Sequence, residues 1–214
     1  MGAWNLLAVG LALFILPHLL STTSLRDRLA GGLGRNTRRG MFSLVVLVGL
    51  VLIVLGYRQA PFAPVFYFPP QWMDYIPLAI MPFAFMLFVG SFAARDMQRV
   101  TRHPQSWAVI LWSLAHLAAN GRAPDVVLFG SLLLFALIMQ PLSDMAARRR
   151  DPETWRKTAA ETSAFPFMAM VSRRAAAPVG DLVEGAGLYG LLAFLGAFIL
   201  HAWLFGVAVM PSLP

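Results

Sequence analysis

The sequence predicts an all-α membrane protein, a bundle of about six transmembrane helices in a single domain that covers residues 1–214. Of its residues, 58% are hydrophobic and only 13% are charged, whereas a soluble domain of this length would carry more charge. The apolar residues form long runs separated by charged pieces, which indicates that lipid is the solvent for much of the surface. In addition, basic residues gather in alternate connections between these runs.

Six apolar segments account for the predicted helices. They are residues 3–21, 41–57, 76–94, 105–120, 125–143 and 186–208. Most are near the ~20 residues that a helix needs to cross about 30 Å of hydrocarbon. The fourth is the shortest, but Pro104 marks its start and the pair Asn120-Gly121 marks its end, as expected for a helix.

The charges of the connections predict the topology. The first, third and fifth connections hold 15 of the 17 Lys and Arg residues, whereas the second and fourth hold only Arg58 and Arg122. The positive-inside rule places basic connections in the cytoplasm. We therefore expect six spans with both termini outside the cytoplasm. The first segment lacks a basic start and an A-x-A site, so we expect it to stay in the membrane as a helix.

Two connections differ from the others in composition. Residues 58–75 are rich in Pro and aromatic side chains, which favour the membrane–water interface and disfavour another helix. The long connection 144–185 contains the apolar stretch AFPFMAMV, which predicts an interfacial helix on the inner leaflet. Because the net charge of +7 comes from such connections, it indicates a membrane surface as the partner and no nucleic acid.

Histidines remain as the ionisable candidates within the predicted spans, because no Asp, Glu, Lys or Arg lies deep within any of the six segments. The chain has no Cys, which excludes disulfides, thiolate catalysis and Cys-ligated metals. His18 lies near the inner end of the first span, His116 in the fourth and His201 in the sixth, while His103 lies at the cytoplasmic mouth of the fourth. A polar group in hydrocarbon is costly without a partner, so these residues are candidates for function.

Each histidine within a span also has a structural interpretation. His116 lies on a polar stripe of its helix, which suits either an interhelical hydrogen bond or a ligand. The other members of the stripe are Gln105, Trp112, Ser113 and Asn120. His18 follows Pro17 and could simply end its helix at the interface. His201 shares a face with small residues, which favours close packing with a hydrogen-bonding histidine. Those residues are Gly187, Gly190 and Ala197.

The number of histidines limits the kind of metal that the protein could bind. His103 and His116 are thirteen residues apart, or about 20 Å along one helix, so a shared ion would need histidines from different spans. Zinc requires three or four close ligands, whereas haem iron needs one or two imidazoles in an apolar slot. The 16 Phe and 6 Trp residues could supply its walls. If the protein binds a metal, haem b is therefore favoured.

Three motifs cover most of the chain. They are Pro17-His18 with Ser21 and the following LRDRL, then RHPQSWAVILWSLAHLAANG at 102–121 with LFG at 128–130, and DPETWRKTAAETSAFPF at 151–167. Together they resemble the NnrU family of bacterial integral membrane proteins, which is named for denitrification gene clusters. This resemblance implies a location in the bacterial inner membrane.

The NnrU family is similar to the plant 15-cis-zeta-carotene isomerase, a haem b enzyme with two axial membrane histidines. The resemblance implies that His18 and His116 ligate a non-covalent haem b between the first and fourth spans. Their depths, roughly 9 Å and 18 Å from the inner ends of their helices, do not match well. His116 with His201 is therefore the second choice. Candidates to line the ring are Phe14, Trp107 and Trp112.

The segment Arg102-His103-Pro104 also resembles the start of a motif in small membrane methyltransferases. In those enzymes a tyrosine follows, whereas this chain continues with QSW. We therefore expect a shared helical core without methyl transfer. On this view Arg102 and His103 are an anchor at the inner interface, where they could hold haem propionates or a lipid phosphate.

Two functions follow from the resemblance, and whether the protein is an enzyme stays open. One is redox-dependent isomerisation of a lipophilic polyene. The alternative is a non-enzymatic haem- or nitric-oxide-related accessory or sensor protein in denitrification. Methyl transfer from S-adenosylmethionine is a third. The expected partners are the lipid bilayer and a lipophilic small molecule, and an oligomer or a larger membrane complex is compatible with the sequence.

Overall fold

The computed structural model describes residues 2–24, 32, 34–60, 63–93, 97–176 and 182–209. Its helices are α1 (Ala3–Ser21), α3 (Arg35–Arg58), η1 (Gln71–Asp74), α4 (Tyr75–Ala93), α5 (Met97–Val100), α6 (Pro104–Ala119), α7 (Ala123–Arg150), α8 (Pro152–Glu161), α9 (Met168–Val171), η2 (Leu182–Gly187) and α11 (Leu188–Phe205). The described residues form no β-sheet, and a single bridge joins Val65 to Arg122. The prediction of an all-α bundle is confirmed.

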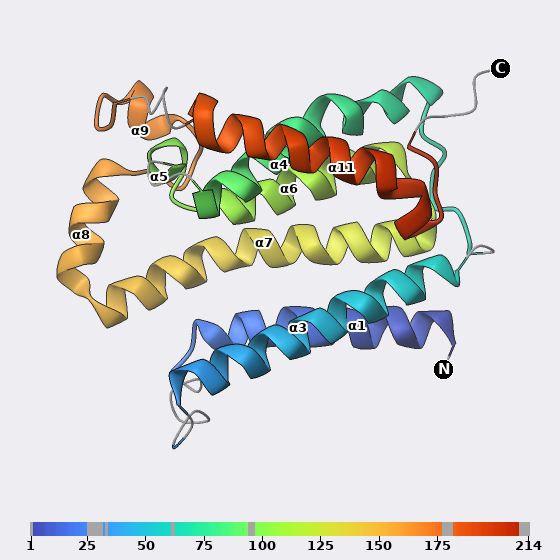
Figure 1. Cartoon of the computed structure of the whole chain (residues 1–214), viewed down its shortest axis with the longest axis horizontal. Coiled ribbons are helices and arrows are strands. Elements are labelled where there is room, and N and C mark those ends of the chain that lie inside the picture. Colours follow the sequence, from blue (N-terminus) through green and yellow to red (C-terminus); the bar gives the residue numbers. More distant parts are fainter. Residues whose placement is uncertain are drawn as a thin grey trace.

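Helix α7 runs through the middle of the bundle (Figure 1). The pair α1–α3 packs on one side of it, and α6 packs on another and contacts α4, which in turn contacts α11. Six buried residues form the core that joins α7 to the α1–α3 pair. They are Leu7, Leu11, Ile53, Leu128, Phe129 and Leu132.

Glycines allow two of these helix pairs to approach closely. A Cβ on Gly10 of α1 would lie 2.6 Å from the backbone nitrogen of Ile53 in α3, and one on Gly190 of α11 would lie 2.6 Å from Cα of Met86 in α4. Both distances are too short for a side chain, so these backbones touch directly. The packing face predicted around His201 is therefore present at Gly190.

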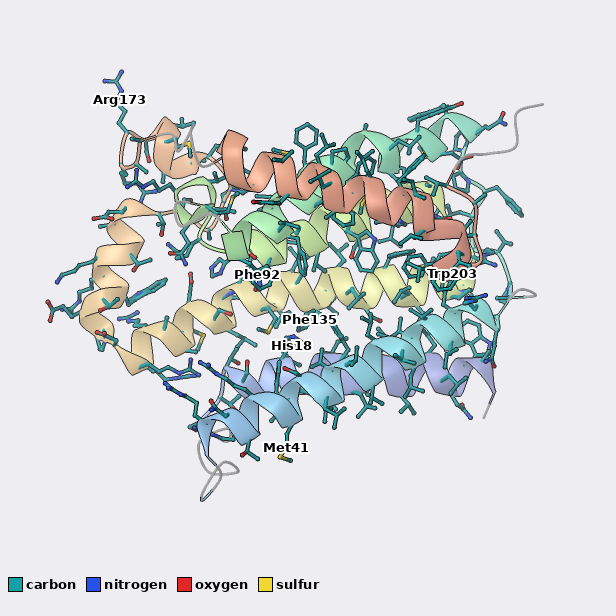
Figure 2. The ribbon with its side chains drawn as sticks, in the orientation of Figure 1. His18, Met41, Phe92, Phe135, Arg173 and Trp203 are labelled. Atoms are coloured by element: carbon teal, nitrogen blue, oxygen red, sulfur yellow. The ribbon has the colours of Figure 1, made fainter. Side chains whose placement is uncertain are left out.

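Five helical stretches are long and apolar enough to cross a membrane. They are Ala3–Ser21, Arg35–Arg58, Gln71–Phe92, Ala123–Arg150 and Gly185–Phe205. Large apolar side chains project from them, among them Phe92 and Trp203, which are 72% and 75% exposed (Figure 2). The chain is a multi-pass membrane protein whose outer surface suits lipid. The 16 residues of α6 span only about 24 Å, and this helix lies between α4 and α7.

The N-terminal end of α1 and the C-terminal end of α11 lie at one end of the bundle, and α8 and α9 lie at the other (Figure 1). Helix α7 continues to Arg150, beyond the predicted end at residue 143. The extension lets Arg149 and Arg150 donate hydrogen bonds of 2.6 and 2.8 Å to the carbonyl oxygens of Thr22 and Ser21. These bonds satisfy carbonyl groups at the C-terminal end of α1.

The apolar stretch between α8 and η2 forms a single short turn of helix, α9, instead of a longer amphipathic helix. Its large side chains are exposed, which suits contact with a membrane surface. They are Phe165, Phe167, Met168 and Val171.

Candidate functional site

Arg102 and Asp144 form a bidentate ion pair at the end of the bundle that carries α8. Nε of Arg102 donates to Oδ1 at 3.1 Å and Nη2 donates to Oδ2 at 2.8 Å. The planar guanidinium matches the carboxylate in this geometry. The pair fixes the residues before α6 against α7.

The segment after α8 completes this cluster. Nη1 of Arg102 donates to Oγ1 of Thr162 at 3.3 Å, and its guanidinium carbon lies 4.7 Å from the ring centroid of Trp155. Nε1 of Trp107 donates to the carbonyl oxygen of Ala164 at 2.7 Å, and its ring contacts Phe165 edge to face. Trp107 therefore supports this segment, at the opposite end of α6 from His116. We name Arg102, His103, Asp144, Trp155 and Thr162 the Arg102 cluster.

His103 is the titratable ring of the Arg102 cluster. Its Nε2 lies 2.8 Å from Oδ1 of Asp144, but the ring N–H is not directed at the oxygen as a full hydrogen bond requires. Burial lowers the pKa of His103 below the ordinary 6.5; Asp144 raises it without offsetting the burial, and Arg102 lowers it further. The neutral ring is therefore favoured in the folded protein.

His18 lies between α7 and the α1–α3 pair (Figure 2). Its Nδ1 is 2.6 Å from the carbonyl oxygen of Phe14. Three phenylalanine rings surround the imidazole, with centroids 4.9 Å away for Phe14, 5.0 Å for Phe42 and 5.6 Å for Phe135. The predicted neighbour Phe14 thus contacts His18.

His116 lies at the interface of α6 and α7. Its Nδ1 is 2.8 Å from the carbonyl oxygen of Trp112, and its ring stacks on Phe129 with centroids 4.6 Å apart. The ring of Trp112 lies 5.6 Å away, edge to face. Oγ of Ser113, in the preceding turn, is buried and has no hydrogen-bond partner among the described residues.

His201 lies near the C-terminal end of α11. Its Nδ1 is 2.9 Å from the carbonyl oxygen of Val207, and its ring contacts Phe205. In all three membrane histidines the contact from Nδ1 to a carbonyl favours the tautomer with hydrogen on Nδ1, which leaves a lone pair on Nε2.

Helix α7 separates His18 from His116. Their contacts on α7 are Phe135 and Phe129 respectively, which are six residues apart, or about 9 Å along the helix, and point to different faces. The structure therefore does not bring His116 face to face with His18, and no hydrogen bond or ring contact among the described residues joins His116 to His201. Among the described residues, no three His, Asp or Glu side chains gather as a metal site.

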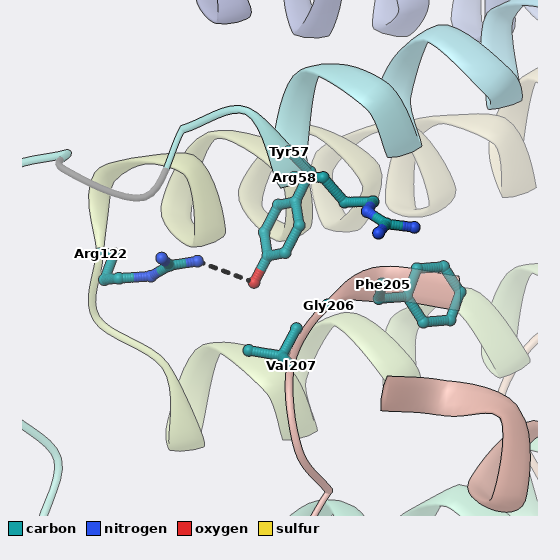
Figure 3. A pocket seen from close by; sticks show the side chains of 6 residues that line it. All are labelled: Tyr57, Arg58, Arg122, Phe205, Gly206 and Val207. Carbon is teal, nitrogen blue, oxygen red and sulfur yellow. Dashed lines mark hydrogen bonds between the residues drawn. The ribbon is translucent and has the colours of Figure 1, made fainter. Parts of the chain in front are cut away.

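A second polar cluster, absent from the sequence predictions, lies at the other end of the bundle. Asp125 is only 1% exposed. Tyr57 donates to its Oδ1 at 2.6 Å, the backbone nitrogen of Arg122 donates to its Oδ2 at 3.0 Å, and Nη2 of Arg122 donates to the hydroxyl of Tyr57 at 3.2 Å (Figure 3). An acidic residue in the first turn of α7 after Pro124 was a signal for this capping arrangement.

A pocket of about 210 Å³ opens beside this cluster (Figure 3). It is lined by Tyr57, Arg58, Arg122, Phe205, Gly206 and Val207. Nη1 of Arg58 donates to the carbonyl oxygens of Trp203 and Leu204 at 3.2 and 3.1 Å, which holds the end of α11 against α3. We name this pocket the outer pocket, because the topology prediction places this end of the bundle outside the cytoplasm.

The family model described as NnrU protein matches residues 6–209, nearly the whole chain. No curated protein and no solved structure matches the chain.

Proposed function

Because the chain belongs to the NnrU family, we propose that it is a bacterial inner-membrane protein that binds one non-covalent haem b. The observation that carries this proposal is a side-chain geometry that His116 and His201 share with His18. Each ring has its Nδ1 within 2.9 Å of a backbone carbonyl oxygen, so each Nε2 has the lone pair that iron requires. The donor chemistry of these residues fits a haem.

His116 is the first proposed ligand. Phe129 stacks on one face of its ring, and among the described residues the ring's hydrogen bond is made by Nδ1. The carbonyl of Trp112 accepts the Nδ1 proton, which makes the imidazole a better electron donor and restricts its rotation. Haem would supply a redox-active iron, which the Nε2 atoms of these histidines would hold. The surrounding apolar side chains would exclude water from it.

His201 is the preferred second ligand in this proposal. The intervening α7 argues against a pairing of His116 with His18, and His201 is the other histidine within a predicted span. The pairing of His18 with His116 follows from the resemblance alone, and we retain it as the alternative ligand set.

For Arg102 and His103 we propose a structural role. The guanidinium already binds Asp144, Thr162 and Trp155, and His103 lies about 20 Å from His116 along the chain direction of α6. The contacts that the guanidinium already makes, together with this separation, favour a structural role over contact with the propionates of a haem held by His116. The Arg102 cluster instead joins α6, α7 and the segment after α8.

Haem content tests the proposal directly. The protein purified in detergent from cells supplied with a haem precursor should contain about one haem per chain and show a Soret band. Absence of haem after purification and after reconstitution with hemin would contradict the proposal. Calorimetry with S-adenosylmethionine is the matched test of the methyltransferase alternative, and we expect no binding.

Redox-dependent isomerisation of a polyene and an accessory role in denitrification both remain proposals that rest on the family resemblance. The two proposals can be distinguished by incubating the haem-loaded protein with a cis-polyene under reducing conditions and separating the isomers by chromatography. Conversion that depends on reduction would support the enzyme, and no conversion would favour the accessory role.

A further inference from the structure

The outer pocket is lined by positively charged side chains. Two guanidinium groups, those of Arg58 and Arg122, line it together with the hydroxyl of Tyr57. One carboxylate, Asp125, faces them, and it is almost completely buried behind Tyr57 and Arg122. The two positive charges and one negative charge leave the pocket with a net charge of +1.

Several donors of these arginines are not used by the protein. In Arg122, Nε and Nη2 donate to Asp125 and Tyr57, while Nη1 has no partner among the described residues. In Arg58, only Nη1 donates, to two carbonyl oxygens of α11. Nε and Nη2 of Arg58 have no acceptor in the part of the chain that the structure describes. The free N–H groups can therefore bind the oxygens of an anion.

The other walls are apolar. Phe205 and Val207 face the two arginines across the pocket (Figure 3). A ligand that fills this space has an anionic part for the guanidinium groups and an uncharged part for the apolar wall. The pocket lies where α3 ends and α7 begins, at the level expected for lipid phosphates. Trp72 and Tyr75, in the segment that follows α3 and leads into α4, are residue types that favour this level.

We propose that the outer pocket binds a phosphate group, with Arg58 and Arg122 as its donors. Two sources share this chemistry, the headgroup of an anionic phospholipid and a free phosphate. The apolar wall favours the phospholipid. This site is separate from the proposed haem ligands, and its occupation does not require haem.

Binding of soluble short-chain lipid to the detergent-purified full chain tests the proposal. We expect dioctanoyl phosphatidylglycerol to bind one per chain by calorimetry and dioctanoylglycerol, which lacks the phosphate, not to bind. Arg58→Gln should weaken binding about tenfold, the effect of losing one charge-assisted contact. Arg156→Gln is the matched control, because Arg156 is exposed at the opposite end of the bundle, and it should bind as the wild type does.

The second titration uses inorganic phosphate alone. Competition of phosphate with the lipid, together with much weaker binding of phosphate, would identify the phospholipid as the ligand. Equal affinity for both would identify a free phosphate as the source. No binding of either, or equal weakening by Arg58→Gln and Arg156→Gln, would overturn the proposal. Arg122→Lys, which keeps the charge that faces Asp125, provides a second variant if Arg58→Gln does not fold.

Discussion

Asp144 lies near the C-terminal end of α7 and accepts two hydrogen bonds from Arg102, at 2.8 and 3.1 Å. The two side chains are 22% and 15% exposed, so water screens this pair less than a surface ion pair. The bond joins segments 42 residues apart in the sequence. The ion pair therefore links the segment before α6 to the last turns of α7.

Replacement of Asp144 by Asn should lower the free energy of unfolding by about 1–3 kcal/mol, because it removes the negative charge and one of the two oxygens that accept from the mostly buried guanidinium of Arg102. Thermal unfolding in detergent measures the effect. Glu153→Gln is the control: Glu153 pairs with Lys157 at 3.0 Å on the exposed face of α8, and its loss should cost less than about 0.5 kcal/mol. Equal effects of the two variants would contradict the role of the Arg102 cluster.

The same cluster predicts a pH dependence. Burial lowers the pKa of His103 below 6.5 in the folded protein, so the unfolded chain binds the proton more readily. The stability that this ring contributes is therefore full above about pH 6.5 and decreases as the pH falls toward the folded pKa. Unfolding followed between pH 5 and 8 should show this decrease in the wild type and a smaller one in His103→Gln. A wild-type protein whose stability increases on acidification would contradict this prediction.

Tyr57 and Asp125 provide a prediction at the opposite end of the bundle. Tyr57→Phe removes one donor from a carboxylate that is 1% exposed, and we expect a loss of about 1–3 kcal/mol in stability. Tyr189→Phe is the matched control, because Tyr189 is 55% exposed on α11. An unchanged unfolding temperature in Tyr57→Phe would show that the cluster does not stabilise the fold.

The topology can be tested with single cysteines, because the natural chain has none. Lys157 on α8 and Gln59 after α3 are both exposed and lie at opposite ends of the bundle. With both termini outside the cytoplasm, Gln59→Cys should react with an impermeant maleimide in intact spheroplasts, and Lys157→Cys only in inverted membrane vesicles. The reverse labelling pattern would place both termini in the cytoplasm and contradict the predicted topology.

The helices were largely predictable, because apolar length and the positions of Pro and Gly determine them locally. The prediction included α6, whose 16 residues are short for a span. The extension of α7 to Arg150 was not predicted, since the reason for it is a tertiary one, the capping of α1 by Arg149 and Arg150. Hydropathy alone does not reveal such a contact.

The sequence predicted several residues of the candidate sites but not the residues that contact them. The sequence identified His116 and Arg102, yet it could not show that His116 stacks on Phe129 or that Arg102 binds Asp144, because helix packing decides both. Asp125 was missed because it lies at the edge of a predicted span, where an acidic residue looks like part of a polar connection. Its burial results from the packing of Tyr57 and Arg122 around it.

The spin state of bound haem in three single variants tests the central proposal most directly. If two imidazoles bind the iron as proposed, absorption and electron paramagnetic resonance spectra of the loaded wild-type protein should be low-spin. We predict that His116→Ala and His201→Ala lose the low-spin signal and that His18→Ala retains it. Loss in His116→Ala and His18→Ala, with retention in His201→Ala, would favour the alternative ligand set. An unaltered low-spin spectrum in His116→Ala would contradict the account.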